Sequence, residues 1–199
     1  MEKPRCRHFR QGSPMTEPAP IVFLDIDDVL CLDLEGRLWV ETAVAGRLPD
    51  PEPMYGRLFS ADAKAALAQI DAACHSRLRY VVSSLWRLVF DRAQMTSIFE
   101  AAGLPFVAQR LEAGDRWRTP HLLGEGRAAE VALWLQRHHR GEAYAVVDDR
   151  FSGLDLIEAV ARAEPYVVDR LAICEEGVGL LEQHVPELVA ALQQPGVCR

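Results

Sequence analysis

Lysine is almost missing from this chain of 199 residues, which contains only Lys3 and Lys64. A fixed positive charge in a functional site is therefore expected to come from an arginine. The five cysteines form no CxxC pair and no spacing that is typical of metal ligands. Scattered free thiols are typical of proteins in a reducing compartment, so we expect a cytoplasmic protein.

Long apolar runs are missing as well. No stretch reaches the length that a membrane-spanning helix needs, and the segment MEKPRCRHFRQGSPMTEPAP lacks the apolar centre of a signal peptide. We expect residues 1–19 to be a disordered tail, with Met15 as a second possible start, and residues 20–194 to form one domain. The net charge of −7 gives the surface as a whole no affinity for nucleic acid or membranes, although a local basic groove remains compatible with it.

Short apolar runs and amphipathic segments alternate along the rest of the chain. Strands are predicted at residues 21–25, 78–84 and 143–149, with weaker candidates at 105–108 and 165–169. Helices are predicted over residues 60–74, 91–102, 127–139, 154–163 and 178–194. This alternation is typical of an α/β domain in which a mainly parallel sheet has helices on both faces.

The segments between these elements are short. LDLEGRLWV, residues 32–40, predicts a β-hairpin, and residues 42–59 are expected to be loop because they contain three prolines and two glycines. Neither this region nor the segment between residues 83 and 127 is long enough for a full cap domain. We therefore expect a three-layer α/β sandwich with a mainly parallel, Rossmann-like sheet, a β-hairpin flap after the first strand and no large cap domain.

Polar groups follow three of the predicted strands. Asp25 and Asp27 follow the first, Ser83 the second, and Asp148 and Asp149 end the third. Because the carboxyl ends of parallel strands meet at one edge of a sheet, we expect these side chains to form one site. Clustered carboxylates repel one another, and a hard divalent cation with oxygen ligands relieves this repulsion. The sequence therefore predicts a Mg²⁺ site.

The spacing of Asp25 and Asp27 suits two different roles. We expect the chain to turn just after Asp25, so that both side chains enter one site. One carboxylate could then attack phosphorus while the other transfers protons. Phosphoryl transfer also needs a cation, for which Arg127 is the first candidate and Arg87 and Arg116 are alternatives.

These segments resemble the four motifs of the haloacid dehalogenase (HAD) superfamily, in the right order. DIDDVL resembles the first motif, YVVSS the second, Arg127 the third and AYAVVDD the fourth. A narrower resemblance rests on SSLWR, on RAAEVALWLQRH before the paired acids, and on a late GVGL. These segments are similar to the small HAD domains related to Swiss Army Knife RNA repair proteins. A receiver domain is excluded, because its paired acids lie on the first strand.

The resemblance implies a role for each matching residue. Asp25 would be the nucleophile that forms an aspartyl-phosphate, and Asp27 would be the general acid and base, with its backbone carbonyl on the metal. Ser83, with Ser84 as a rival, and Arg127 would hold the phosphoryl group. Asp148 and Asp149 would complete the Mg²⁺ site together with Asp25 and Asp27, and family members differ in which of the paired acids contacts the metal directly.

Two functions are compatible with this pattern. The first is a Mg²⁺-dependent phosphatase that acts on a phosphorylated substrate, either a small phosphomonoester or a nucleic-acid end. The second is a HAD-fold binding or regulatory module of little activity, linked to RNA processing or repair. Among the other notable residues, Trp134 is expected in the core. The segment 114–118, GDRWR, is either a solvated loop or a phosphate contact in which Trp117 stacks on a base.

Overall fold

The computed structural model describes residues 18–32, 38, 42, 45–46 and 52–196. The predicted tail lies almost wholly outside these residues, and only Leu32 and Leu38 of the predicted hairpin are described, so both predictions remain untested. The described chain forms a sheet of four parallel strands in the order β2-β1-β3-β4. The strands are β1 (Ile21–Leu24), β2 (Arg79–Val82), β3 (Tyr144–Asp149) and β4 (Leu171–Cys174).

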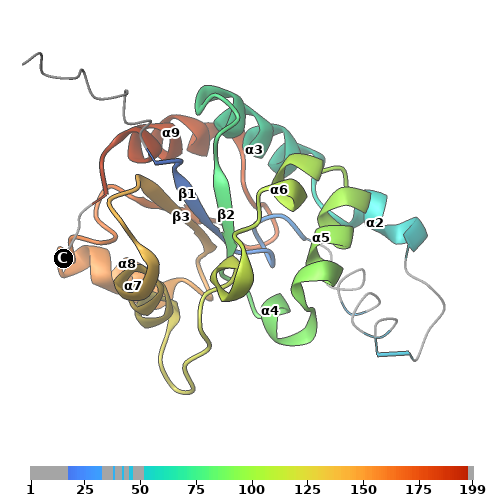
Figure 1. Cartoon of the computed structure of the whole chain (residues 1–199), viewed down its shortest axis with the longest axis horizontal. Helices are drawn as coiled ribbons and strands as arrows, with labels where there is room; N and C mark the ends of the chain where they lie inside the picture. The colour runs from blue at the N-terminus through green and yellow to red at the C-terminus, as the bar shows by residue number, and fades with distance from the viewer. Residues whose placement is uncertain (1–17, 33–37, 39–41, 43–44, 47–51, 197–199) are drawn as a thin grey trace, which may run out of the picture.

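Helices connect the strands and cover both faces of the sheet (Figure 1). They are α2 (Glu52–Leu58), α3 (Ala61–Ala73), α4 (Trp86–Val89), α5 (Arg92–Ala101), α6 (Pro105–Gln109), α7 (Arg127–His138), α8 (Leu154–Ala161) and α9 (Val185–Gln193), with the 3₁₀ turns η1 (Gly114–Trp117) and η2 (Glu182–His184). Among the described helices, none combines the length and the apolar character that crossing a membrane requires.

Two apolar cores lie on opposite faces of the sheet. Val22 and Leu24 of β1 belong to the larger core, which also contains residues of α3, α5 and α9. Ile21 and Phe23 alternate with them and belong to the smaller core, beneath α7 and α8. This alternation is the two-residue period of a strand that is buried on both faces. The predicted three-layer α/β sandwich is therefore confirmed, and the described residues contain no cap domain.

Two helices begin where the sequence predicted, because a capping residue marks each start. The Ser60 hydroxyl accepts a hydrogen bond from the backbone N–H of Ala63 at the start of α3. Asp91 and Gln94 form a reciprocal capping box at the start of α5. Such side chains satisfy the free N–H groups of a first helical turn, which is why helix starts can be found in a sequence.

Two weak strand predictions were wrong. Residues 105–108 belong to α6, where Pro105 occupies the first helical turn and needs no hydrogen-bond partner. Residues 165–169 belong to consecutive turns that run to Arg170 and include Asp169 with a φ of +58°, and the strand β4 starts only at Leu171. The last helix was predicted too long, because η2 precedes α9. Residues 52–58, predicted as loop, form α2.

The strand order places a topological switch point between β1 and β3. The chain leaves β1 to form β2 on one side and then returns to form β3 on the other side of β1. Loops that leave the carboxyl ends of β1 and β3 therefore run in opposite directions, and ligands bind at such switch points in open α/β sheets.

Candidate active site

Three predicted site residues form a row across the sheet. Leu24 pairs with Val82 of β2 and with Val147 of β3, so the next residues, Asp25, Ser83 and Asp148, lie side by side. Backbone hydrogen bonds fix this row, from Asp25 N–H to the Val147 carbonyl at 3.0 Å and from Ser83 N–H to the Leu24 carbonyl at 2.8 Å. The register of the sheet thus builds the centre of the site.

A tight turn directly after Asp25 brings Asp27 to the same site. The Ile26 carbonyl accepts hydrogen bonds from the N–H groups of Leu30 and Cys31, at 2.9 and 2.8 Å. Asp28 allows this turn by adopting a φ of +53°, which few residues other than glycine, asparagine and aspartate adopt easily. The charge of Asp27 contributes to the raised pKa of Asp25, so the two acids are close.

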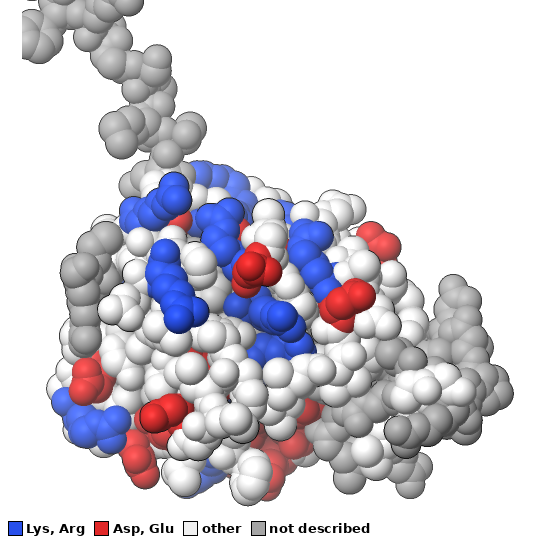
Figure 2. Space-filling model, turned by 60° about the horizontal axis from the view of Figure 1, so that its bottom comes forward, with Lys and Arg blue, Asp and Glu red and all other residues white. Residues whose placement is uncertain are grey.

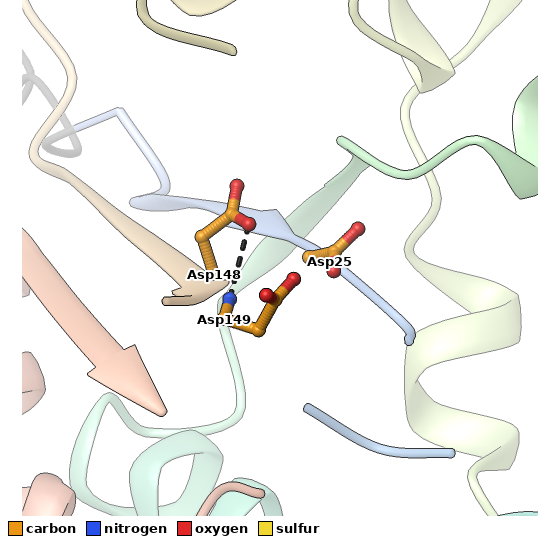
Figure 3. A group of neighbouring side chains, drawn as sticks. All are labelled: Asp25, Asp148 and Asp149. Atoms are coloured by element: carbon orange, nitrogen blue, oxygen red, sulfur yellow. Dashed lines mark hydrogen bonds between the residues drawn. The ribbon is translucent and has the colours of Figure 1, made fainter. Parts of the chain in front are cut away.

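Three buried carboxylates form the centre of the site (Figure 3). One oxygen each from Asp25, Asp148 and Asp149 lies within 4.8 Å of the others. Burial, and then the neighbouring charge of Asp148, raises the pKa of Asp25 well above its usual range, and Arg127 opposes this effect. Burial also raises the pKa of Asp148 to about 7, although Arg127 and the Ser152 hydroxyl lower it. The group therefore resists carrying three negative charges by itself.

Arg127, the predicted cation, lies within this group. Its Nε donates to Asp148 Oδ2 at 3.1 Å, and one terminal nitrogen lies 3.4 Å from Asp25 Oδ1. Burial alone would lower the pKa of Arg127, but the carboxylates of Asp148, Asp25 and Glu130 raise it. A side chain anchors the start of α7, because Asp155 accepts from the backbone N–H of Ala128 at 2.6 Å. Arg127 is thus held in place by its helix as well as by its partners.

The structure distinguishes the two serines. Ser84 Oγ accepts a hydrogen bond from the backbone N–H of Trp86 at 3.4 Å, at the beginning of α4. Ser83 Oγ is buried beside Asp25 and has no partner within the described residues. A buried hydroxyl without a partner costs free energy unless a ligand supplies one. The geometry therefore favours Ser83 for phosphate binding and gives Ser84 a structural hydrogen bond.

The paired acids at the end of β3 are held by the turn that follows. Asp149 Oδ1 accepts from the backbone N–H groups of Phe151 and Ser152, at 2.6 and 3.0 Å. The Ser152 hydroxyl donates to Asp148 Oδ1 at 2.5 Å and also contacts Asp149 Oδ2. Gly153 is needed here, because a Cβ atom would lie 2.6 Å from the Asp149 carbonyl oxygen. We did not predict Ser152, although its position just after the paired acids was a usable signal.

Glu130 links several parts of the site and was not predicted either. Its buried carboxylate accepts from Arg127 at 3.2 Å, from Arg87 at 2.6 Å and from the Leu122 N–H at 3.1 Å, and it lies 3.2 Å from His121 Nδ1. The available signal was its position three residues after Arg127, on the same face of the helix. Glu130 thereby ties Arg127 to the loop before α7 and to Arg87.

The two alternative cations have other positions. Arg87 is 1% exposed and belongs to the surroundings of Arg127 through Glu130. Arg116 lies in η1, where it forms an ion pair with Glu112 at 3.3 Å.

Trp117 is buried, so it offers no surface on which a base could stack, whereas Trp134 lies in the core as predicted.

Asp27 differs from the other acids. Its side chain is not part of the three-carboxylate group, and its Oδ1 accepts a hydrogen bond from the indole N–H of Trp86 at 2.7 Å. A carboxylate set apart from the metal-binding group is available for proton transfer. The pattern is compatible with the division of roles that the sequence suggested for Asp25 and Asp27.

The acidic group fits a hard divalent cation. All three side chains offer carboxylate oxygens, which are the ligands that Mg²⁺ prefers. Asp25 Oδ2 is buried and has no partner in the described part of the chain, so one ligand atom is free. Asp25, Asp148 and Asp149 could therefore hold such an ion.

A parallel sheet with buried aspartates directly after β1 and at the end of β3 is the arrangement expected of a HAD-type α/β domain. The family model for the HAD domain in Swiss Army Knife RNA repair proteins matches residues 21–185. The chain belongs to this family. Searches of the curated proteins and of the solved structures gave no significant match.

Proposed function

We propose that this protein is a Mg²⁺-dependent phosphomonoester hydrolase that forms an aspartyl-phosphate on Asp25. One observation carries the proposal: Ser83, Asp25 and Asp148 lie in one row, and both Ser83 Oγ and Asp25 Oδ2 are buried without a partner among the described residues. A phosphoryl group beside Arg127 would supply an acceptor for the serine hydroxyl and an electrophile for the carboxylate.

The first step transfers the phosphoryl group to the protein. An Asp25 oxygen attacks phosphorus, the bond between phosphorus and the leaving oxygen breaks, and Asp27 gives its proton to that oxygen. Arg127 lies 3.4 Å from Asp25 and is placed to neutralise charge on the phosphoryl oxygens. The leaving group departs as a neutral alcohol, and Asp27 is left ionised.

The second step returns the site to its starting state. Asp27 takes a proton from water while the water oxygen attacks phosphorus, and the bond between phosphorus and Asp25 breaks. Inorganic phosphate leaves, Asp25 is again a carboxylate and Asp27 is again protonated. When bound at Asp25, Asp148 and Asp149, a divalent cation would supply positive charge that favours the ionised acids and stabilises the transferred group.

The proposal is tested by phosphate release in the wild type and in Asp25→Asn. The substrates are p-nitrophenyl phosphate and oligonucleotides with a 5′- or 3′-phosphate, each with Mg²⁺ and with EDTA. We expect Mg²⁺-dependent release that falls by at least ~10³-fold in Asp25→Asn, because the nucleophile is lost. Asp62→Asn is the matched control, since Asp62 is exposed in the first turn of α3.

The results separate the two candidate functions. A binding module keeps its role without turnover, so the absence of release from every substrate by the wild type would overturn the phosphatase proposal. Release that persists in Asp25→Asn would overturn the assignment of the nucleophile. Loss of release in Asp62→Asn would show that the effect is not specific to the site.

The oligonucleotide substrates are included because one face of the molecule is rich in arginine. Figure 2 shows basic side chains gathered on the upper half of this face, despite the negative net charge. Arg116 contributes, with Arg137 and Arg140, to the lowered pKa of His138, after the larger effect of burial. Arg118 donates to the Arg87 carbonyl at 2.8 Å, which brings this basic region next to the site. Release that weakens steeply with salt would indicate that phosphate groups bind there.

A further inference from the structure

Trp86 connects the loop after β2 to the acid that follows β1. Its indole Nε1 donates to Asp27 Oδ1 at 2.7 Å, across 59 positions of sequence. Trp86 is the first residue of α4, two residues after Ser84, and its side chain is 1% exposed. The segment SSLWR therefore supplies the site with more than a phosphate-binding serine.

We propose that Trp86 is a positioning residue, which holds the carboxyl group of Asp27 where it can protonate the leaving group. This inference rests on the proposed function. An indole N–H can only donate, so it fixes an oxygen of Asp27 as its acceptor. The distance of 2.7 Å lies at the short end of the range for N–H···O hydrogen bonds.

The surroundings of the indole make it a rigid support. Its ring centroid lies 5.4 Å from that of Phe90 and 6.3 Å from that of Phe59. Its backbone N–H is bound by the Ser84 hydroxyl, 3.4 Å away. Asp27, by contrast, is partly exposed and lies within a tight turn. A side chain that is locked by packing can hold a more mobile partner in a productive geometry.

A purely structural role for Trp86 predicts a different outcome. A buried indole needs an acceptor, and Asp27 could simply be the nearest one. Loss of the indole would then weaken the site as a whole and slow every substrate equally. A positioning role instead affects only the proton transfer, which matters more when the leaving oxygen is strongly basic.

The test compares phenyl phosphate with p-nitrophenyl phosphate in Trp86→Phe. The two substrates are similar in shape, but phenolate needs a proton far more than nitrophenolate does. We expect kcat/KM for phenyl phosphate to fall about 10-fold further than for p-nitrophenyl phosphate, as loss of aligned acid catalysis requires. When Trp86→Phe is added to Asp27→Asn, the ratio of kcat/KM between the two substrates should not change further, because the acid that Trp86 positions has already been removed.

Trp134→Phe is the matched control. Trp134 is also buried, and its indole N–H donates to a backbone carbonyl, that of Arg116, at 3.0 Å. We expect this variant to lose stability without changing the ratio between the two substrates. If Trp86→Phe lowered kcat/KM equally for phenyl phosphate and p-nitrophenyl phosphate, or lowered neither, the positioning role would be overturned. That result would leave the phosphatase standing, whereas a wild type without turnover would remove both.

A second measurement covers the case in which Trp86→Phe does not fold. In the wild type and in Asp27→Asn, the indole N–H signals are compared by NMR. We expect the Trp86 signal to shift in Asp27→Asn and the Trp134 signal to stay in place. An unmoved Trp86 signal would show that the hydrogen bond to the Asp27 carboxylate is not formed in solution, and would overturn the inference.

Discussion

The two ends of the sheet hold polar clusters of opposite character. Near the amino ends of the strands the buried acids are paired with arginines, as in the bidentate contact between Arg110 and Asp71 at 2.7 and 2.8 Å. Arg79 likewise binds both Glu112 and Glu142.

At the carboxyl ends, Asp25 and Asp148 share Arg127, which also binds Glu130, and Asp149 lies beside them without an arginine contact among the described residues. In the first cluster, arginines within the chain compensate the charge of the acids. In the second, three carboxylates are grouped around one arginine, so a bound ligand or ion would be needed to compensate their charge.

This difference separates a cluster that stabilises the fold from the cluster that we propose as the catalytic site. Buried acids cost free energy unless hydrogen bonds and opposite charges compensate them. The amino-end cluster has this compensation within the chain. The carboxyl-end cluster leaves Asp25 Oδ2 and Ser83 Oγ without a partner in the described chain, as expected where a site is made for a substrate and an ion.

After Asp25→Asn, the largest effect is expected from Arg127→Ala. This variant should lower kcat by about 10²–10³-fold, because one fixed positive charge beside the phosphoryl group is lost. The measurement is phosphate release at saturating Mg²⁺. Arg127→Lys should recover part of the rate, since it keeps the charge but loses the planar fork.

Arg116→Ala is the control for this prediction, because Arg116 pairs with Glu112 outside the aspartate group. We expect it to retain wild-type turnover of p-nitrophenyl phosphate. If Arg127→Ala instead kept its turnover and lost mainly thermal stability, the two ends of the sheet would not differ in the way described.

The reverse pattern is expected from Arg110→Met, at the amino end. The free energy of unfolding should fall by about 2 kcal/mol, because buried Asp71 loses both of its N–H donors. Turnover should not change. Denaturant unfolding and a phosphate assay on the same preparation measure both quantities.

Arg162→Met is the control at an exposed pair. Arg162 lies 3.7 Å from Glu158, and both side chains are more than half exposed. The expected change is below about 0.5 kcal/mol, since exposed ion pairs contribute little. An equal loss in the two variants would contradict the view that burial makes the amino-end pair important.

The sequence was sufficient to predict the row of site residues. Asp25, Ser83 and Asp148 each follow an apolar run, and a parallel sheet necessarily brings such positions to one edge. The four motifs in order added the expected roles. The prediction succeeded because it depended on strand ends, which local patterns reveal, and not on the direction of any one side chain.

The supporting residues could not be predicted in the same way. The bond between Trp86 and Asp27 depends on how a short helix after β2 faces a tight turn after β1, which no local pattern encodes. Glu130 joins Arg87 and Arg127 across 43 and 3 positions, and only the shorter spacing was visible in the sequence. The last strand was predicted at residues 165–169 because Val167 and Val168 are apolar. Those residues belong to a run of turns, and β4 begins only at Leu171.

The smallest effect concerns the pH dependence of stability without metal. Burial raises the pKa of Asp148 from its ordinary value of 3.8 to about 7 in the folded chain. Between these values the folded protein holds a proton that the unfolded chain has released, so stability should fall as the pH rises toward 7. In EDTA, we expect the Tm of the wild type to be lower at pH 7.5 than at pH 5.5, and Mg²⁺ to restore it at pH 7.5.

Asp148→Asn tests whether Asp148 causes this pH dependence of the Tm, because the amide cannot ionise. In EDTA its Tm should depend less on pH than that of the wild type, and Mg²⁺ should stabilise it less. Asp169→Asn, at an exposed position, should behave like the wild type. A wild type whose metal-free stability rises between pH 5.5 and 7.5 would contradict the account. The three carboxylates would then be compensated within the chain, and the carboxyl end would be as complete as the amino end.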